Sequence, residues 1–175
     1  MIEISSEQLK RANNALRAVP GAFPRAITSA TNRALEGMRT DTVSGTSKRY
    51  HVKASDIRKT ITLKKANFNN LQGVMLSRGS RRSLADYKLT SKSGSLMGAV
   101  KKDGMKALRS AFLMERRGKA RPYFKTSRGI EPIISPSIPQ IVKNKDTVVE
   151  MEKNTEVRFK KHLDHEILRL LGVFK

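Results

Sequence analysis

The chain has one cluster of side chains with metal-binding chemistry, and it lies near the C-terminus. His162 and His165 are three residues apart, which on a helix places both on one face, and Glu166 follows directly. This order differs from H-E-x-x-H, in which a general base stands between two zinc-binding histidines. The third histidine, His51, is distant in sequence. We therefore expect a polar helix face here, with no metal and no other cofactor.

Hydroxyl groups and carboxylates show no catalytic arrangement. No serine lies in a G-x-S-x-G turn, and the glycine-rich segment 94–98 lacks the lysine and hydroxyl residue that end a phosphate-binding loop. The four acidic residues between positions 42 and 130 are scattered among cations and form no acid–base pair. The sequence therefore predicts a protein that is not an enzyme.

Positively charged residues gather at the expected turns and strand ends in the middle of the chain. The formal net charge is +21, and residues 42–130 hold 22 basic and 4 acidic side chains, which is +18 of it. A field of one sign attracts polyanions or an acidic partner. The predicted polyanion or DNA contacts are Lys64, Lys65, Arg78, Arg81, Arg82, Lys101, Lys102, Arg116, Arg117, Lys119 and Arg121.

These cations have three alternative explanations. Cationic turns contact phosphate without reading bases, so nucleic-acid binding would be salt-sensitive and independent of sequence. The few aromatic residues of the segment do not form the stacking platform that single-strand binders use. An acidic surface of a partner protein fits about equally well, and a merely solvated surface is the third alternative.

The hydrophobic pattern predicts an α+β protein. Apolar residues at helical spacing cover 23–50 and 145–171, after a shorter helical segment within 1–22. The basic region 55–128 has the pattern of short antiparallel strands, and three prolines mark 129–142 as an extended crossover. We expect a single domain of 175 residues, in which a small antiparallel sheet with basic hairpin loops packs against the long N-terminal and C-terminal helices.

Two hairpins are predicted within the basic region. Polar and apolar residues alternate over 60–63, Asn67 begins a turn, and the chain returns through Val74 and Leu76. The basic segment 116–121 is the predicted tip of the second hairpin. Between the hairpins, the serines and glycines of 91–98 indicate a flexible connector.

Both long helices carry residues suited to close helix contacts. Small side chains at every fourth position of the long helix predicted over 23–50 let another backbone approach. This backbone is either that of the chain's own sheet or that of a neighbouring subunit. The candidates for a subunit interface are Ala26, Ala30, Ala34, Phe159, Leu163 and Ile167.

Composition excludes several classes. The sequence contains no Cys, so disulfides and Cys-based zinc sites are absent, which is compatible with a reducing cytoplasm. No apolar run approaches the roughly 20 residues of a membrane span, and the N-terminus has no signal-peptide pattern. We expect a protein without membrane contact that stays where it is synthesised.

A series of short blocks resembles the minor tail protein Z family of tailed bacteriophages. The similarity extends over about residues 23–171 and keeps the order of the blocks. They are residues 56–66 (DIRKTITLKKA), 77–80 (SRGS), 111–112 (AF), 135–139 (SPSIP) and 165–166 (HE).

This resemblance implies a structural protein of the virion that completes the tail at its head-proximal end and helps to join tail to head. It further implies a ring of copies around the DNA channel, with six-fold symmetry favoured. Tail tube or terminator proteins and head-connector proteins would be its neighbours, in the host cytoplasm during assembly and in the virion afterwards. The alternative is a sequence-independent nucleic-acid-binding protein of ribosomal or architectural type, which the basic composition alone suits.

Overall fold

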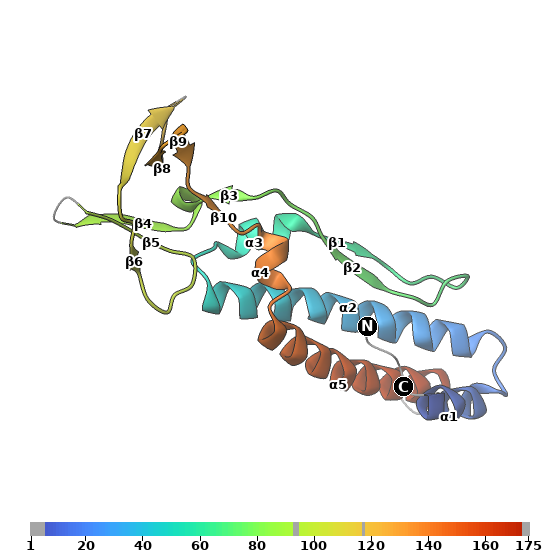
Figure 1. Ribbon diagram of the computed structural model, residues 1–175. Coiled ribbons are helices and arrows are strands. Elements are labelled where there is room, and N and C mark those ends of the chain that lie inside the picture. The colour runs from blue at the N-terminus through green and yellow to red at the C-terminus, as the bar shows by residue number, and fades with distance from the viewer. Residues whose placement is uncertain (1–5, 93–94, 117, 173–175) are drawn as a thin grey trace. The chain divides into compact units, whose positions relative to one another are not determined.

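The computed structural model describes residues 6–92, 95–116 and 118–172 and has an α+β fold, as predicted (Figure 1). The chain forms two compact units, where the sequence indicated one domain. Unit 1 comprises Met1–Thr42, Ile61–Leu76 and Lys145–Lys175, and unit 2 comprises Val43–Thr60 and Ser77–Asn144. Each unit has buried apolar side chains of its own.

Unit 1 is built on three helices. Helix α1 spans Ser6–Leu16, α2 spans Ala22–Arg49 and α5 spans Lys145–Leu170. Helix α2 continues beyond Thr42 into unit 2. Both long helices begin and end within about one residue of the predicted bounds, because their apolar residues keep the helical period throughout.

The core of unit 1 lies where these three helices meet. Alanines of α2 and the larger Phe159 and Leu163 side chains of α5 belong to the same buried cluster. The buried members of this core are Ala12, Leu16, Ala22, Ala26, Ile27, Ala30, Ala34, Phe159 and Leu163.

This core corrects the predicted subunit interface. Five of the six candidates, Ala26, Ala30, Ala34, Phe159 and Leu163, are buried within a single chain, and Ile167 packs against them partly buried. The small residues of α2 are covered by the chain's own core, to which α5 contributes. A face for a second copy therefore has to lie elsewhere.

A β-hairpin completes unit 1, as predicted. Strand β1 (Ile61–Lys64) pairs with β2 (Val74–Ser77). The Asn67 side chain accepts hydrogen bonds from the backbone N–H groups of Asn69 and Asn70, which closes the connecting turn. The Asn32 side chain of α2 exchanges two hydrogen bonds with the backbone of Ala66, so the hairpin is fixed to this helix.

Unit 2 contains small separate sheets in place of the single sheet predicted. Helix α3 (Ala54–Thr60) precedes them, and β3 (Arg82–Ser83) pairs with β10 (Ile134–Ser135). A single 3-10 turn, η1 (Leu84–Asp86), follows β3. Strands β4 (Lys88–Lys92), β5 (Ser95–Ala99) and β6 (Lys106–Ala107) form a three-stranded antiparallel sheet.

The predicted connector at 91–98 is therefore wrong in its described part. Leu96 and Ala99 are buried, and Gly98 packs closely against Leu84. The serine- and glycine-rich segment is therefore a packed strand. Residues 93–94, within this segment, lie outside the described residues.

A second three-stranded sheet carries the predicted basic hairpin. Strands β7 (Ala111–Arg116), β8 (Lys119–Thr126) and β9 (Gly129–Pro132) pair antiparallel in that order. The extended crossover predicted at 129–142 consists of β9, β10 and then a short helix, α4 (Ile138–Val142), which the prolines concealed. Ser137 and Gln140 form a capping box at its start.

No helix in the described ranges is long and apolar enough to cross a membrane.

Candidate polyanion interface

The pairing of β7, β8 and β9 assigns their side chains to two faces. Arg116 pairs with Lys119, and Met114 pairs with Arg121, so these four side chains project from the same face. Lys125 belongs to this face as well, since it lies at an even spacing from Lys119 on β8. We call Arg116, Lys119, Arg121 and Lys125 the basic face; all four side chains are exposed.

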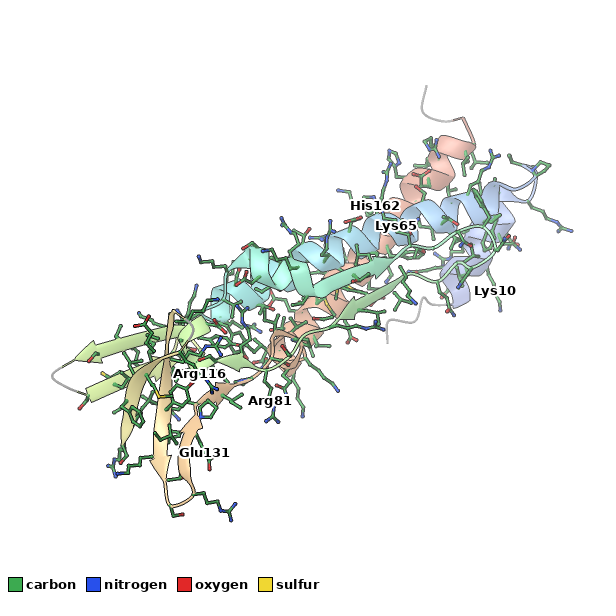
Figure 2. All side chains as sticks on the ribbon, turned by 90° about the horizontal axis from the view of Figure 1, so that it is seen from above. Lys10, Lys65, Arg81, Arg116, Glu131 and His162 are labelled. Atoms are coloured by element: carbon green, nitrogen blue, oxygen red, sulfur yellow. The ribbon has the colours of Figure 1, made fainter. Side chains whose placement is uncertain are left out.

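The opposite face of this sheet carries its acidic residues. Glu115 pairs with Ala120 and Glu131 pairs with Phe124, both at the alternate positions. The Thr126 hydroxyl donates to Glu131 Oε1 at 3.3 Å, which confirms that Glu131 projects from the face that Thr126 shares. Figure 2 labels Arg116 on β7 and Glu131 on β9. The three strands thus place cations on one side and carboxylates on the other.

An aromatic pair supports the middle of the basic face. The rings of Phe112 and Tyr123 stack with centroids 6.4 Å apart, as directly paired residues of β7 and β8 can do. Tyr123 is only 6% exposed, so its ring supports the strands and is not available to stack on a base. The chemistry that this face offers is therefore charge, which recognises phosphates or carboxylates.

Glycine shapes the hairpin tip that carries Arg116 and Lys119. Gly118 has a φ of +70° between the two strands, a conformation that tight hairpin turns require and that glycine adopts without strain. This turn aligns the ends of β7 and β8, so the two cations stand side by side. The fourth predicted cation of this tip, Arg117, lies outside the described residues.

A second group of cations lies where the end of α2 meets the loop after β5. Tyr50 pairs with Lys101 as an isolated bridge, and the Lys102 N–H donates to the Arg49 carbonyl at 2.9 Å. Burial lowers the pKa of His51, and the charges of Lys88 and Lys102 lower it further. The His51 N–H donates to the Val100 carbonyl at 2.9 Å, and Lys88 pairs with Ala99, the residue before Val100. We call Lys88, Lys101 and Lys102, the three lysines near this histidine, the second basic cluster.

Arg82 has ion-pair partners within unit 2. Its guanidinium lies 3.3 Å from Asp56 Oδ2 and 3.6 Å from Asp86 Oδ2, and its side chain is 25% exposed. Two carboxylates therefore neutralise it and connect α3 to η1 within unit 2. Sequence reasoning grouped it with Arg81 because adjacency cannot show which of two arginines has partners.

The remaining predicted contacts are exposed but scattered. Arg78 and Arg81 lie on the segment between β2 and β3. Lys64 and Lys65 belong to unit 1, and Lys65 Nζ lies 3.2 Å from Glu36 Oε1 as a surface ion pair. Such a pair holds a lysine weakly, so it remains able to meet another anion.

Lys125 and Lys88 are members of these sites that sequence analysis missed. The signal for Lys125 was present, because KARPYFKT places a cation or an aromatic ring at every second position from Lys119. Period-two alternation of this kind indicates one face of a strand. Lys88 had no comparable signal, since only its pairing with Ala99 brings it near Lys101 and Lys102.

The carboxylate of the histidine-containing cluster of α5 is engaged within the protein. Glu166 is buried, and its carboxylate accepts hydrogen bonds from the Ser29 hydroxyl and from Arg169. Its oxygens are therefore already engaged by donors. Within the described ranges, no three His, Asp or Glu side chains gather in a way that holds a metal ion.

Comparison with known proteins gives no match from which a function could be inferred. No family model, no curated protein and no solved structure matches the chain.

Proposed function

We propose that this chain is a structural protein that binds the backbone of nucleic acid through unit 2. The observation that carries this proposal is the separation of charge on the sheet of β7, β8 and β9, with Arg116, Lys119, Arg121 and Lys125 on one face and both glutamates on the other. A surface that is merely solvated has no reason to separate its charges in this way.

The charge of unit 2 supports a polyanionic ligand. Unit 2 holds 21 basic and 5 acidic residues, a net charge of +16, against +5 for unit 1. The exposed part of the face offers charge and no stacking ring, so we expect binding that ignores base sequence.

The resemblance to the minor tail protein Z family supports a particular setting for this binding. In that setting the chain completes a phage tail at its head-proximal end and helps to join tail to head. Copies of it form a ring around the DNA channel, next to tail and head-connector proteins, in the virion. A cationic lining that does not read bases suits a channel through which any DNA sequence passes. No catalytic role is part of the proposal.

The binding part of the proposal is tested with the full chain and a random-sequence DNA duplex. The variant Arg116→Glu/Lys119→Glu/Arg121→Glu reverses the basic face at its tip. Fluorescence anisotropy at fixed salt should show duplex affinity reduced by about tenfold or more. Each lost phosphate contact lowers the number of counterions that binding releases from the DNA.

A matched control separates this face from total charge. Lys10→Glu/Arg17→Glu/Arg25→Glu changes the net charge by the same amount at exposed positions of unit 1. It should bind the duplex nearly as tightly as the unchanged chain. Equal losses in both triple variants would mean that only net charge matters and would refute a defined binding face.

The tail-completion part has its own test, which is electron microscopy of phage tails that contain the chain. Density for the chain at the head-proximal end, around the axis, is the expected result. Absence of the chain from assembled tails would favour the ribosomal or architectural alternative. Saturable binding to a structured RNA, much tighter than to duplex DNA, would favour that alternative as well.

A further inference from the structure

Helix α5 presents an apolar face that the described part of unit 1 leaves uncovered. Val149 is 65% exposed and Val157 is 61% exposed, and Leu168 and Leu171 are also exposed. All four are exposed, whereas Phe159 and Leu163 of the same helix are in the core. Exposed leucines and valines scattered singly need no explanation, but these four recur along one side of the helix with charged residues between them.

The spacing of this surface gives it a defined geometry. Apolar and charged residues follow one line along α5 with steps of 3, 4, 4, 3, 4, 4 and 3 residues. Eleven residues make three turns with a drift of only about 20°, so this line stays on one side of a straight helix. We call these residues the α5 seam: Asp146, Val149, Lys153, Val157, Lys160, Asp164, Leu168 and Leu171.

The order of steps in the seam is the same from either end. When two copies of α5 lie antiparallel about a two-fold axis between Val157 and Lys160, position 149 of one chain meets position 168 of the other. In the same arrangement Lys153 meets Asp164, and this pair occurs twice. Two apolar pairs and two opposite-charge pairs thus arise from one register.

The charged members of this register are available for such pairs. Lys153 and Asp164 are exposed and take part in no ion pair among the described residues. Lys160 pairs along its own helix with Glu156 at 3.0 Å, which leaves its aliphatic stem to cover Val157 of the other copy.

We propose that the α5 seam binds a second copy of this chain, antiparallel and two-fold symmetric, with Lys153 of each copy against Asp164 of the other. The proposal goes beyond nucleic-acid binding, because the seam shares no residue with the basic face. It also differs from a ring contact. A ring closes through head-to-tail surfaces, whereas a two-fold contact joins chains in pairs.

Charge exchange at the central pair tests this register. In Lys153→Asp the full chain has aspartate at both positions, and in Asp164→Lys it has lysine at both. Either variant alone places like charges against each other twice, which weakens pairing by on the order of a hundredfold. Sedimentation equilibrium should show a dimer for the unchanged chain and a monomer for each variant at the same concentration.

Mixing the two variants provides the decisive measurement. A Lys153→Asp copy opposite an Asp164→Lys copy restores both opposite-charge pairs, so an equimolar mixture should return to the dimer mass. The double variant Lys153→Asp/Asp164→Lys should also dimerise. Loss of folding cannot produce this recovery, and circular dichroism of each variant checks that α5 remains helical.

Two charge changes away from the seam serve as controls. Lys10→Asp and Asp103→Lys make the same changes in net charge at exposed positions away from the seam and should leave the dimer intact. A monomeric unchanged chain would overturn the proposal, as would a dimer that survives both single exchanges or a mixture that stays monomeric. None of these outcomes affects duplex binding by the basic face, so failure of one proposal is distinguishable from failure of the other.

Discussion

Glu166 is a carboxylate that is 1% exposed in the helical core of unit 1. Burial alone would raise its pKa, but the hydrogen bonds from Ser29 and Arg169, together with the charges of Arg169 and Arg33, outweigh burial and lower it. A buried charge of this kind persists only when donors surround it. The residue that suggested a metal ligand in the sequence is therefore an internal ion-pair centre.

Neutralising Glu166 should destabilise unit 1. Glu166→Gln keeps the shape but removes the charge that two arginines meet, and Arg33 and Arg169 are about half exposed, so water compensates in part. We expect a loss of about 1–3 kcal/mol in the free energy of unfolding at pH 7, measured by urea titration. Glu7→Gln, at an exposed pair with Arg11, should cost less than about 0.5 kcal/mol. Equal costs for the two variants would contradict a buried ion-pair centre.

The same carboxylate should make unfolding depend on pH. Because its pKa is lowered in the folded chain, its stabilisation is complete above the unfolded value of 4.5 and is lost as pH falls through the folded value. The difference in unfolding free energy between the unchanged chain and Glu166→Gln should therefore shrink below pH 4.5. Urea titrations at pH 7, 5 and 3.5 measure it. A difference that stays constant down to pH 3.5 would show that this carboxylate does not titrate as described.

Gly37 interrupts the pattern of α2 for a reason that only the fold reveals. A Cβ at this position would overlap the guanidinium of Arg158, which crosses the glycine to reach Asp41 at 2.9 Å. Glycine in a helix costs about 1 kcal/mol relative to alanine. At this position the missing Cβ leaves room for an ion pair between α2 and α5, which offsets that loss of stability.

A double-mutant cycle measures how strongly Gly37 and Arg158 are coupled. In the unchanged background Gly37→Ala should displace Arg158 and gain no stability, or lose some. With Arg158→Ala already present, the same change should stabilise unit 1 by about 1 kcal/mol through helix propensity. Chemical denaturation of the unchanged chain and the three variants gives the coupling, expected at about 1 kcal/mol or more. Equal effects of Gly37→Ala in both backgrounds would exclude the proposed contact.

At the scale of elements, the success of sequence analysis followed the strength of the periodic signal. The apolar period of α5 continues for 26 residues, and its predicted bounds were accurate. The β4–β5 hairpin was missed because Ser91, Ser95 and Gly98 have the composition of a linker. Burial of β5 against Leu84 and not intrinsic propensity makes this segment a strand.

Adding one carbon to β5 tests this explanation. A Cβ on Gly98 would lie 2.6 Å from Leu84 Cδ2 and 3.4 Å from Leu108 Cδ1, so Gly98→Ala forces the packed leucines to move. We expect unit 2 to lose about 1–3 kcal/mol of stability. Thermal unfolding measures this loss, and Thr90→Ala, at an exposed site on the neighbouring strand β4, is the control. The control should change the stability by no more than about 0.5 kcal/mol. An unchanged Gly98→Ala would mean that the segment is not tightly packed.

At the scale of the whole molecule, composition predicted where charge gathers but not how it is sorted. The excess in the middle of the chain became the +16 of unit 2. Which cations share a face depended on the register of β7 with β8, and which are neutralised depended on Asp56 and Asp86 reaching Arg82. The predicted interface of Ala30 and Leu163 failed for the same reason, since a helical apolar stripe does not say which helix covers it.

The salt dependence of duplex binding separates free cations from neutralised ones. For B-DNA the slope of log K against log salt is about −0.9 per phosphate contact. Arg116→Ala, Lys119→Ala and Arg121→Ala should each make the slope shallower by about 0.9, and the triple variant by about 2.7. Arg82→Ala should leave the slope unchanged and lower the melting temperature, because its charge is held by Asp56 and Asp86. Anisotropy titrations over a series of salt concentrations give all the slopes. A shallower slope for Arg82→Ala, or none for the three others, would place the phosphate contacts outside the basic face.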